Sequence, residues 1–278
     1  MKFSDLRVLA IGGHPDDADT FAGCTVIKWS DHGARVRFLS VCNGDKGWHR
    51  VPNDGVAERR RGEASAAAKA FGVERYDIWE IPDCEIEPTL ELRRRMTRLV
   101  RAFSPHVIIT HRTCDYHADH RACSRLVQDT AYLLGLPNWC PDAPIPSVRP
   151  AVFFMTDDFD FPRALRPDAV VSAEDVMDRY LDALACHESQ FFEFLPVDMG
   201  LDLAEVPDRA DRSAVREYML KWHACVKRTD AKRFSGRIAE WYGAAAAPGH
   251  VEVFEMSRYG RQMSEDELRW LFAMQGNI

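Results

Sequence analysis

The stretch LRVLAIGGHPDDAD, from Leu6 to Asp19, decides the fold and holds half of the predicted site. Its first part, Leu6 to Ile11, is an apolar run without alternation, which is typical of a parallel strand buried on both faces. Two glycines follow, and then His14, Asp16 and Asp17 bring one imidazole and two carboxylates to one point. Because zinc binds imidazole nitrogen and carboxylate oxygen, this turn predicts part of a metal site.

The alternation of strand and helix continues along the chain. After the first strand the apolar spacing predicts a helix, and further pairs follow with short connections. This order predicts a doubly wound, mostly parallel, Rossmann-like α/β sheet with helices on both faces. We expect strands at 6–11, 35–42, 76–81, 106–110, 151–156, 169–172 and 251–257, and helices at 17–29, 58–71, 89–103, 119–134, 174–190, 213–226, 231–242 and from 265 onward.

Length alone leaves the number of domains open, because 278 residues suffice for one large domain or two modest ones. No linker is long or polar enough to force a boundary. We therefore expect a single α/β domain over residues 1–278, with a core at about 1–190 and C-terminal elaborations, helices and a late strand, in 191–278.

Charge and hydropathy argue against several classes of protein. The formal net charge of -7 disfavours a nucleic-acid binder, which normally presents a basic face. No run approaches the roughly 18 apolar residues of a membrane span, so no membrane partner is expected. The N-terminus lacks a signal-peptide pattern, which predicts a cytoplasmic location. A small molecule is the expected partner, and a homo-oligomer is left open.

A second histidine-rich segment, DYHADH from Asp115 to His120, follows the fourth expected strand. The carboxyl ends of parallel strands meet at one edge of a sheet, so this segment and the first turn are expected to lie together. A catalytic zinc site needs three protein ligands and an open position, and His117 or His120 can supply the third ligand. Either motif alone also fits an ordinary hydrogen-bonded His and Asp pair, whereas their coincidence favours a metal.

Six segments together carry a family resemblance. They are GHPDDADTFAGCT (Gly13 to Thr25), NGDKG (Asn43 to Gly47), RRGEASAAAKAFGV (Arg60 to Val73), PDCEI (Pro82 to Ile86), DYHADH (Asp115 to His120) and ALACHESQ (Ala183 to Gln190). In this order they resemble the LmbE-like, or PIG-L, zinc-dependent de-N-acetylases, and the layout is most similar to the bacillithiol-pathway branch. The resemblance implies a deacetylase or amidohydrolase that cleaves a linear amide bond of an N-acyl amino sugar or glycoconjugate, with zinc, or another divalent metal such as Fe2+, as cofactor.

The resemblance also implies a division of roles at the metal. His14, Asp17 and His120 would bind it. Asp16 would be the general base for the attacking water, and His117 would stabilise the tetrahedral oxyanion as a cation or proton donor. This division agrees with elementary chemistry, because a metal-activated water needs a base and the leaving amine needs a proton.

Four further residues receive expected roles from the resemblance. Asp115 and Asp119 would orient imidazoles, as outer carboxylates commonly do in metal sites. Arg60 and Asp83 would contact the substrate. Arg60 also belongs to the run Arg59 to Arg61 on an expected helix, and such runs are usually a solvated face.

Several positions depart from the family pattern or leave it open. Asp19 stands where Glu is usual, Cys24 where Gly is expected and Ala118 where Pro is usual, but none of these changes removes a ligand. His111 follows a strand and is expected to line the pocket. His187 fits a hydrogen bond at the core edge and a contact to the site equally well.

Three other functions compete with the main interpretation. Within the enzymes, the alternative is an amidase, or a deacetylase that tailors a secondary metabolite. A nucleotide-binding Rossmann-like protein is disfavoured, because GGHPDD is not GxGxxG and its two carboxylates would repel a pyrophosphate. A non-catalytic metal-binding protein would retain its metal without hydrolysing any amide.

Overall fold

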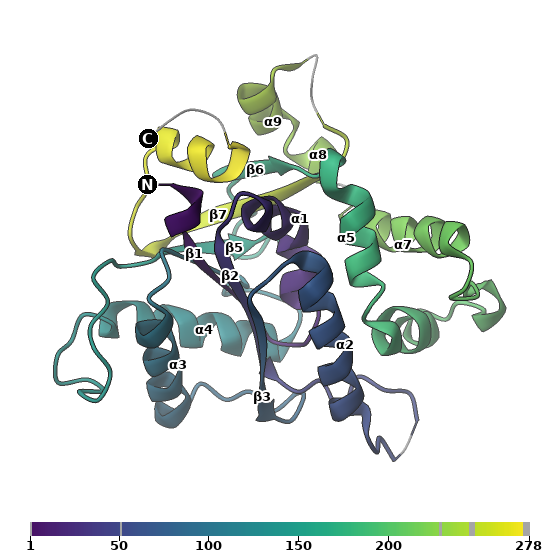
Figure 1. Ribbon diagram of the computed structural model, residues 1–278, viewed down its shortest axis with the longest axis horizontal. Helices are drawn as coiled ribbons and strands as arrows, with labels where there is room; N and C mark the ends of the chain where they lie inside the picture. Colours follow the sequence, from purple (N-terminus) through teal and green to yellow (C-terminus); the bar gives the residue numbers. More distant parts are fainter. Residues whose placement is uncertain (1, 51, 228–229, 245–247, 275–278) are drawn as a thin grey trace.

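The computed structural model describes residues 2–50, 52–227, 230–244 and 248–274, and in them a seven-stranded sheet forms the centre of the molecule (Figure 1). The strand order is β3-β2-β1-β4-β5-β7-β6. Strands β1 to β5 pair in parallel, and β7 is antiparallel to both neighbours. The predicted doubly wound, mostly parallel α/β sheet is confirmed. The strands are β1 (Arg7–Gly12), β2 (Arg35–Cys42), β3 (Arg75–Ile81), β4 (Val107–Thr110), β5 (Ala151–Met155), β6 (Ala169–Ser172) and β7 (Val251–Gly260).

The first strand, β1, lies in the middle of the parallel part of the sheet. It pairs with β2 on one side and β4 on the other, so that Val8 is in register with both Val36 and Val107. Its apolar run is buried on both faces, as a run without alternation predicts. The chain goes from β1 to β2 and β3, and returns on the other side at β4. The strand order therefore reverses beside β1, which is where ligands bind in such sheets.

Helices pack on both faces of this sheet (Figure 1). Phe38 on β2 joins the core beneath α1, α2 and α5, whereas its neighbour Leu39 joins the core beneath α3 and α4. In the described part of the chain, no helix is long and apolar enough to cross a membrane. The α-helices are α1 (Asp17–Asp31), α2 (Val56–Phe71), α3 (Leu90–Phe103), α4 (Ala118–Leu133), α5 (Met177–Leu184), α6 (Leu195–Asp198), α7 (Arg212–Lys227), α8 (Asp230–Arg233), α9 (Ser235–Tyr242) and α10 (Glu265–Leu268).

Two expected helices are interrupted in the structure. The single helix predicted at 174–190 is wrong, because α5 stops before His187 and a π-helical segment begins after it. The break turns the His187 imidazole inward, where its Nε2 lies 2.8 Å from Asp19 Oδ1. The helix predicted at 231–242 is divided into α8 and α9 at Phe234, whose ring is buried. A buried side chain therefore lies at each break.

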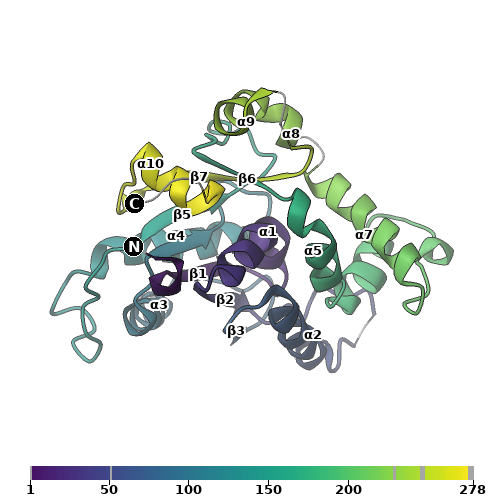
Figure 2. The ribbon, with the colours of Figure 1, turned by 45° about the horizontal axis from the view of Figure 1, so that its top comes forward.

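The C-terminal region enters the sheet through β7, which lies beside β5 and β6 (Figure 2). Glu252 on β7 is fully buried, and its carboxylate reaches α1. It accepts hydrogen bonds from Cys24 N at 2.9 Å, Thr25 N at 2.8 Å and Thr25 Oγ1 at 2.6 Å. Glu252 therefore links β7 to α1, the helix that follows the HPDD turn (residues 14–17). The division into a core at about 1–190 and an elaboration stays a prediction.

Replacing Glu252 with Ala is expected to lower the free energy of unfolding by about 3 kcal/mol, because the substitution leaves buried donors of α1 without this acceptor. Urea unfolding followed by circular dichroism measures the change. The matched control is Glu58→Ala, whose side chain is 83% exposed, and it should change the free energy by less than about 0.5 kcal/mol. Equal effects of the two substitutions would contradict the role of Glu252.

Candidate metal centre

The predicted site residues come together at the carboxyl ends of the parallel strands. The HPDD turn follows β1, Asp83 follows β3, and the segment from Asp115 to His120 follows β4 and begins α4. The connections after β1 and β4 lie at the point where the strand order reverses, and Asp83, which follows the edge strand β3, reaches them through its contact with His14. The fold therefore collects residues that are about 100 positions apart in sequence into one cluster, such as His14 and His120, 106 positions apart.

Glycine at positions 12 and 13 allows the turn to close against α4. A Cβ atom on Gly12 would lie 2.6 Å from Asp17 Cβ, and one on Gly13 would lie 3.2 Å from His120 Cδ2. The backbone N–H of His14 donates to Asp17 Oδ2 at 2.7 Å, which fixes the carboxylate beneath the imidazole. The sequence GGHPDD thus provides both the ligands and the space that they need.

The side chains of three predicted ligands form a compact triangle, in which two imidazole nitrogens lie near each other and near one oxygen each of the Asp17 carboxylate. His14 Nδ1 lies 3.2 Å from His120 Nε2 and 3.4 Å from Asp17 Oδ2. His120 Nε2 lies 3.3 Å from Asp17 Oδ1. Ligand atoms about 2.0 to 2.1 Å from a tetrahedral zinc ion are about 3.3 Å from one another. The spacing of the three side chains therefore fits a zinc ion.

The carboxylates of Asp115 and Asp83 orient the imidazoles of His120 and His14, because each contacts the ring nitrogen that points away from the triangle. Nδ1 of His120 lies 2.9 Å from Asp115 Oδ1, and Nε2 of His14 lies 3.1 Å from Asp83 Oδ1. When these outer nitrogens carry the protons, the inner nitrogens face each other with lone pairs at 3.2 Å. Two facing lone pairs repel unless a cation lies between them. The donor set of the cluster therefore fits a metal ion.

The charges around the imidazoles favour a cation in the same place. Burial opposes protonation of His14, but hydrogen bonds to neighbouring carboxylates raise its pKa well above the ordinary value. Burial also opposes protonation of His120, and the charges of Asp17 and Asp115 raise its pKa to about 9. Burial alone would raise the pKa of Asp17, yet the two imidazoles beside it, His120 and His111, lower it well below the ordinary value. A metal ion satisfies the same preference for positive charge.

The sequence predicts that His111 lines the pocket, but in the structure it also lies in direct contact with two of the predicted metal ligands, His120 and Asp17. Its ring stacks on His120, with centroids 3.9 Å apart and planes at 6°. Its Nε2 lies 3.1 Å from Asp17 Oδ2 and accepts a hydrogen bond from Gly13 N at 3.1 Å. Because the Gly13 N–H occupies this nitrogen, His111 fits a supporting role better than that of a ligand. The signal in the sequence was its position directly after β4.

Asp16 and His117 occupy positions consistent with acid and base chemistry. Asp16 is 8% exposed, and its backbone φ of 154° is rare outside glycine. Burial, and then the charge of Asp17, raise the pKa of Asp16 to about 7. His117 Nδ1 accepts a hydrogen bond from Asp119 N at 3.1 Å, which leaves Nε2 as the protonated nitrogen. Its ring meets that of His14 edge-on, with centroids 4.5 Å apart.

The two expected orienting carboxylates hold different parts of the site. Asp115 Oδ1 accepts hydrogen bonds from His117 N at 2.9 Å and from the His120 ring. Asp119 accepts hydrogen bonds from Cys84 N at 2.7 Å and Ile86 N at 3.2 Å, and its Oδ2 lies 3.4 Å from His14 Nε2. Asp115 thus orients the His120 ring. Asp119 lies near the His14 ring and, through its two backbone hydrogen bonds, holds the loop after β3 in place.

The two expected substrate contacts lie in the cleft. Arg60 is only 2% exposed and donates to Gly47 O at 2.7 Å and to Gln190 Oε1, whereas Arg59 lies on the exposed side of α2. The solvated-face alternative is therefore wrong for Arg60. Asp83 does more than line the cleft, because it also contacts His14, and its Oδ2 accepts from Gly47 N at 3.1 Å.

A buried polar network beneath the turn was not predicted as a unit. Asp19 Oδ1 lies 2.8 Å from His187 Nε2, and its Oδ2 accepts from Tyr76 Oη at 2.7 Å. Both the carboxylate and the imidazole are essentially unexposed. The shorter carboxylate of Asp19 therefore has two partners in the core. His187 belongs to this network and contacts the base of α1.

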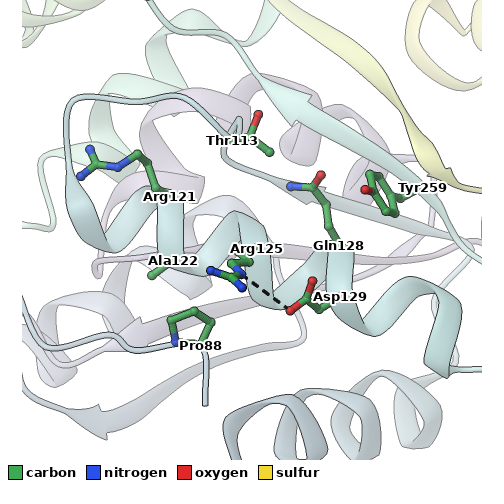
Figure 3. A pocket seen from close by; sticks show the side chains of 8 residues that line it. All are labelled: Pro88, Thr113, Arg121, Ala122, Arg125, Gln128, Asp129 and Tyr259. Carbon is green, nitrogen blue, oxygen red and sulfur yellow. Dashed lines mark ion pairs between the residues drawn. The ribbon is translucent and has the colours of Figure 1, made fainter. Parts of the chain in front are cut away.

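A cleft of about 390 Å³ is lined by the three predicted ligands together with Asp16, Asp83 and His117. It adjoins a second hollow of about 340 Å³, which His111 and Asp115 line. Phe21, Tyr116 and His120 line both. A larger hollow of about 460 Å³ lies over the outer side of α4, where Figure 3 shows the ion pair between Arg125 and Asp129. Its lining side chains include none of the predicted site residues. The chemistry therefore belongs to the cleft at the strand ends.

Solved structures with the same fold carry more than one activity. N,N'-diacetylchitobiose deacetylase from Pyrococcus horikoshii aligns with a TM-score of 0.66 at 23% identity, over 90% of this chain and 83% of that one. GalB, the 4-carboxy-2-hydroxymuconate hydratase from Pseudomonas putida KT2440, aligns with a TM-score of 0.67 at 19% identity, over 93% and 100%. At these identities the likeness shows the fold alone, and the reaction has to be argued from the site.

Sequence relatives give more specific information. Diacetylchitobiose deacetylase from Thermococcus kodakarensis is 29% identical over 202 residues, which cover 69% of this chain and 73% of the relative. A 1D-myo-inositol 2-acetamido-2-deoxy-alpha-D-glucopyranoside deacetylase from Saccharopolyspora erythraea is 27% identical over 179 residues, which cover 53% of this chain and 64% of the relative. Residues 9–131 match the family model of the GlcNAc-PI de-N-acetylases, PIG-L. The predicted resemblance to this family is therefore confirmed, and the matched region contains both the HPDD turn and the DYHADH segment.

Proposed function

We propose that this protein is a zinc-dependent amide hydrolase that removes an acyl group, in the first instance acetyl, from an N-acyl amino sugar or glycoconjugate. The observation that carries the proposal is the triangle of His14, Asp17 and His120 within a cleft that also holds Asp16 and His117. The names of the two sequence relatives, both deacetylases of acetylated amino-sugar compounds, support the substrate class.

His14, Asp17 and His120 would hold the metal through two nitrogens and a carboxylate. This donor set is common in catalytic zinc sites, and Fe2+ also accepts it. When bound, the metal lowers the pKa of a water molecule and polarises the amide carbonyl. Asp115 and Asp83 fix the imidazoles so that Nε2 of His120 and Nδ1 of His14 point inward.

Asp16 and His117 would move the protons of the reaction. With a pKa near 7, Asp16 can accept a proton from the attacking water at neutral pH. His117 carries its proton on Nε2, because Nδ1 caps α4, and this proton can stabilise the oxyanion and pass to the leaving amine. The helix cap thereby selects the tautomer that a proton donor needs.

The cleft offers separate contacts for the two ends of a substrate. Arg60 and Asp83 are the nominated contacts for sugar hydroxyls, since one is a buried donor and the other a carboxylate acceptor. The adjoining hollow of about 340 Å³ shares Phe21 and Tyr116 with the cleft, so a substrate larger than one sugar can extend into it. The same hollow would give room to the larger amides of the alternative substrates.

Release of free amine from N-acetylglucosamine and N,N'-diacetylchitobiose tests the proposal. We expect hydrolysis by the metal-loaded protein, loss of hydrolysis after treatment with a chelator, and recovery when zinc is restored. N-acyl derivatives with longer chains, assayed in parallel, report acyl specificity. A metal-loaded protein that releases no amine from any member of the series would argue against amide hydrolysis.

A further inference from the structure

Cys84 occupies an unusual position at the edge of the cleft. It is the third residue of a turn closed by a hydrogen bond from Glu85 N to Pro82 O at 3.2 Å. Its φ is 64°, and a turn of this kind favours glycine at the third position. The residue is exposed, and its thiol lies 3.4 Å from Asp83 Oδ1. A turn that favours glycine thus places an accessible thiol beside the predicted active site.

His117 completes a set of three different metal-binding groups with this thiol. One ligand atom each from Asp83, Cys84 and His117 lies within 4.8 Å of the others. Around zinc, sulfur and nitrogen or oxygen ligands are about 3.5 Å apart, so small movements of the exposed thiol and the half-buried imidazole would close the set. Zinc binds thiolate, imidazole and carboxylate, and softer divalent cations such as cadmium favour the thiolate.

We propose that Asp83, Cys84 and His117 form a second, weaker cation site, and that Zn2+ in excess, or Cd2+, inhibits the enzyme by binding there. The inhibition, though not the binding, rests on the proposed hydrolase function. This site is distinct from the triangle of His14, Asp17 and His120, because it shares no residue with that triangle and includes a thiol. As the metal–sulfur bond forms, the Cys84 thiol releases its proton to solvent.

Occupation of the second site would remove two groups from the reaction. A cation on His117 Nε2 displaces the proton that the leaving amine requires. A cation on Asp83 Oδ1 competes with the contact to His14 Nε2 at 3.1 Å. In the neutral His117 ring the imidazole proton then lies on Nδ1, where it breaks the hydrogen bond from Asp119 N that caps α4. This loss explains why the second site would be weaker than the first.

Cadmium titration of the zinc-loaded protein tests the second site. Cadmium bound to a thiolate has an ultraviolet charge-transfer band, and this band is followed together with amine release. In the wild type, the band should grow to about one equivalent of cadmium while the rate falls in parallel. The variant Cys84→Gly removes the thiol and suits the positive φ, so it is expected to fold. It should show no band, and its own rate should persist over the same range.

Cys114→Ser is the matched control, because Cys114 is a partly exposed thiol outside this cluster. It should behave like the wild type in both measurements. A band that survives in Cys84→Gly, an unaltered inhibition in that variant, or the absence of any band in the wild type would overturn the second site. A wild-type band that Cys84→Gly loses, in a protein that releases no amine from any substrate, would support the site and refute the hydrolase proposal. The two hypotheses can therefore fail separately.

Discussion

Asp16→Asn is expected to lower kcat by about 10²-fold to 10⁴-fold while leaving one metal ion bound, because general base catalysis contributes about this much. Asp16 is not part of the triangle formed by His14, Asp17 and His120. Its burial and the neighbouring carboxylate of Asp17 raise its pKa to about 7, so its proton affinity is high for an aspartate. The amide of asparagine preserves the size of the side chain but cannot accept the proton.

Two measurements together test the role of Asp16. Metal content by elemental analysis should equal that of the wild type, and kcat should fall with a smaller change in KM. Asp178→Asn is the matched control, since the side chain of Asp178 is 75% exposed on α5. Its kcat and metal content should match the wild type. Full activity of Asp16→Asn would place the base elsewhere, and loss of metal would mean that Asp16 supports the metal site.

The parts of the site that local sequence could predict are those that follow directly from strand position. Both motifs follow strands, so in a parallel sheet they lie at the same carboxyl edge, and the pairing of β1 with β4 brings them together. The distances among His14, Asp17 and His120 are the result of that topology. Asp115 was predictable in the same way, because it lies five residues from His120 on the same connection.

Contacts between distant segments set the remaining features, and local patterns carry little information about them. Arg59 and Arg60 are adjacent and identical in type, yet one is exposed while the other is buried against Gly47 and Gln190. The apolar spacing predicts a helix that continues through His187. In the structure α5 ends before His187, whose ring forms a hydrogen bond with Asp19, 168 positions away in sequence. Contacts of this kind decide which side chains are buried and which ring nitrogen of a histidine carries the proton. A single sequence does not reveal them.

The ligand set itself is open to a direct test, because two overlapping triangles share Asp17 and His120. One is completed by His14 and the other by His111. His14 Nδ1 has a free lone pair when its Nε2 donates to Asp83, whereas His111 Nε2 already accepts from Gly13 N at 3.1 Å. We therefore expect His120→Ala and His14→Ala to lose the metal.

His111→Gln is the informative comparison, because it removes the ring but keeps a polar group near Asp17. A residue that supports a ligand typically changes metal affinity by about 10-fold to 100-fold, so His111→Gln should still fill with about one zinc ion when the metal is in excess. Titration of the metal-free proteins with zinc, followed by calorimetry, measures all three variants. If His111→Gln failed to bind while His14→Ala bound normally, the metal would belong to the triangle of Asp17, His111 and His120. His14 would then be free to act on the substrate, and the assignment of acid and base within the cleft would have to change with it.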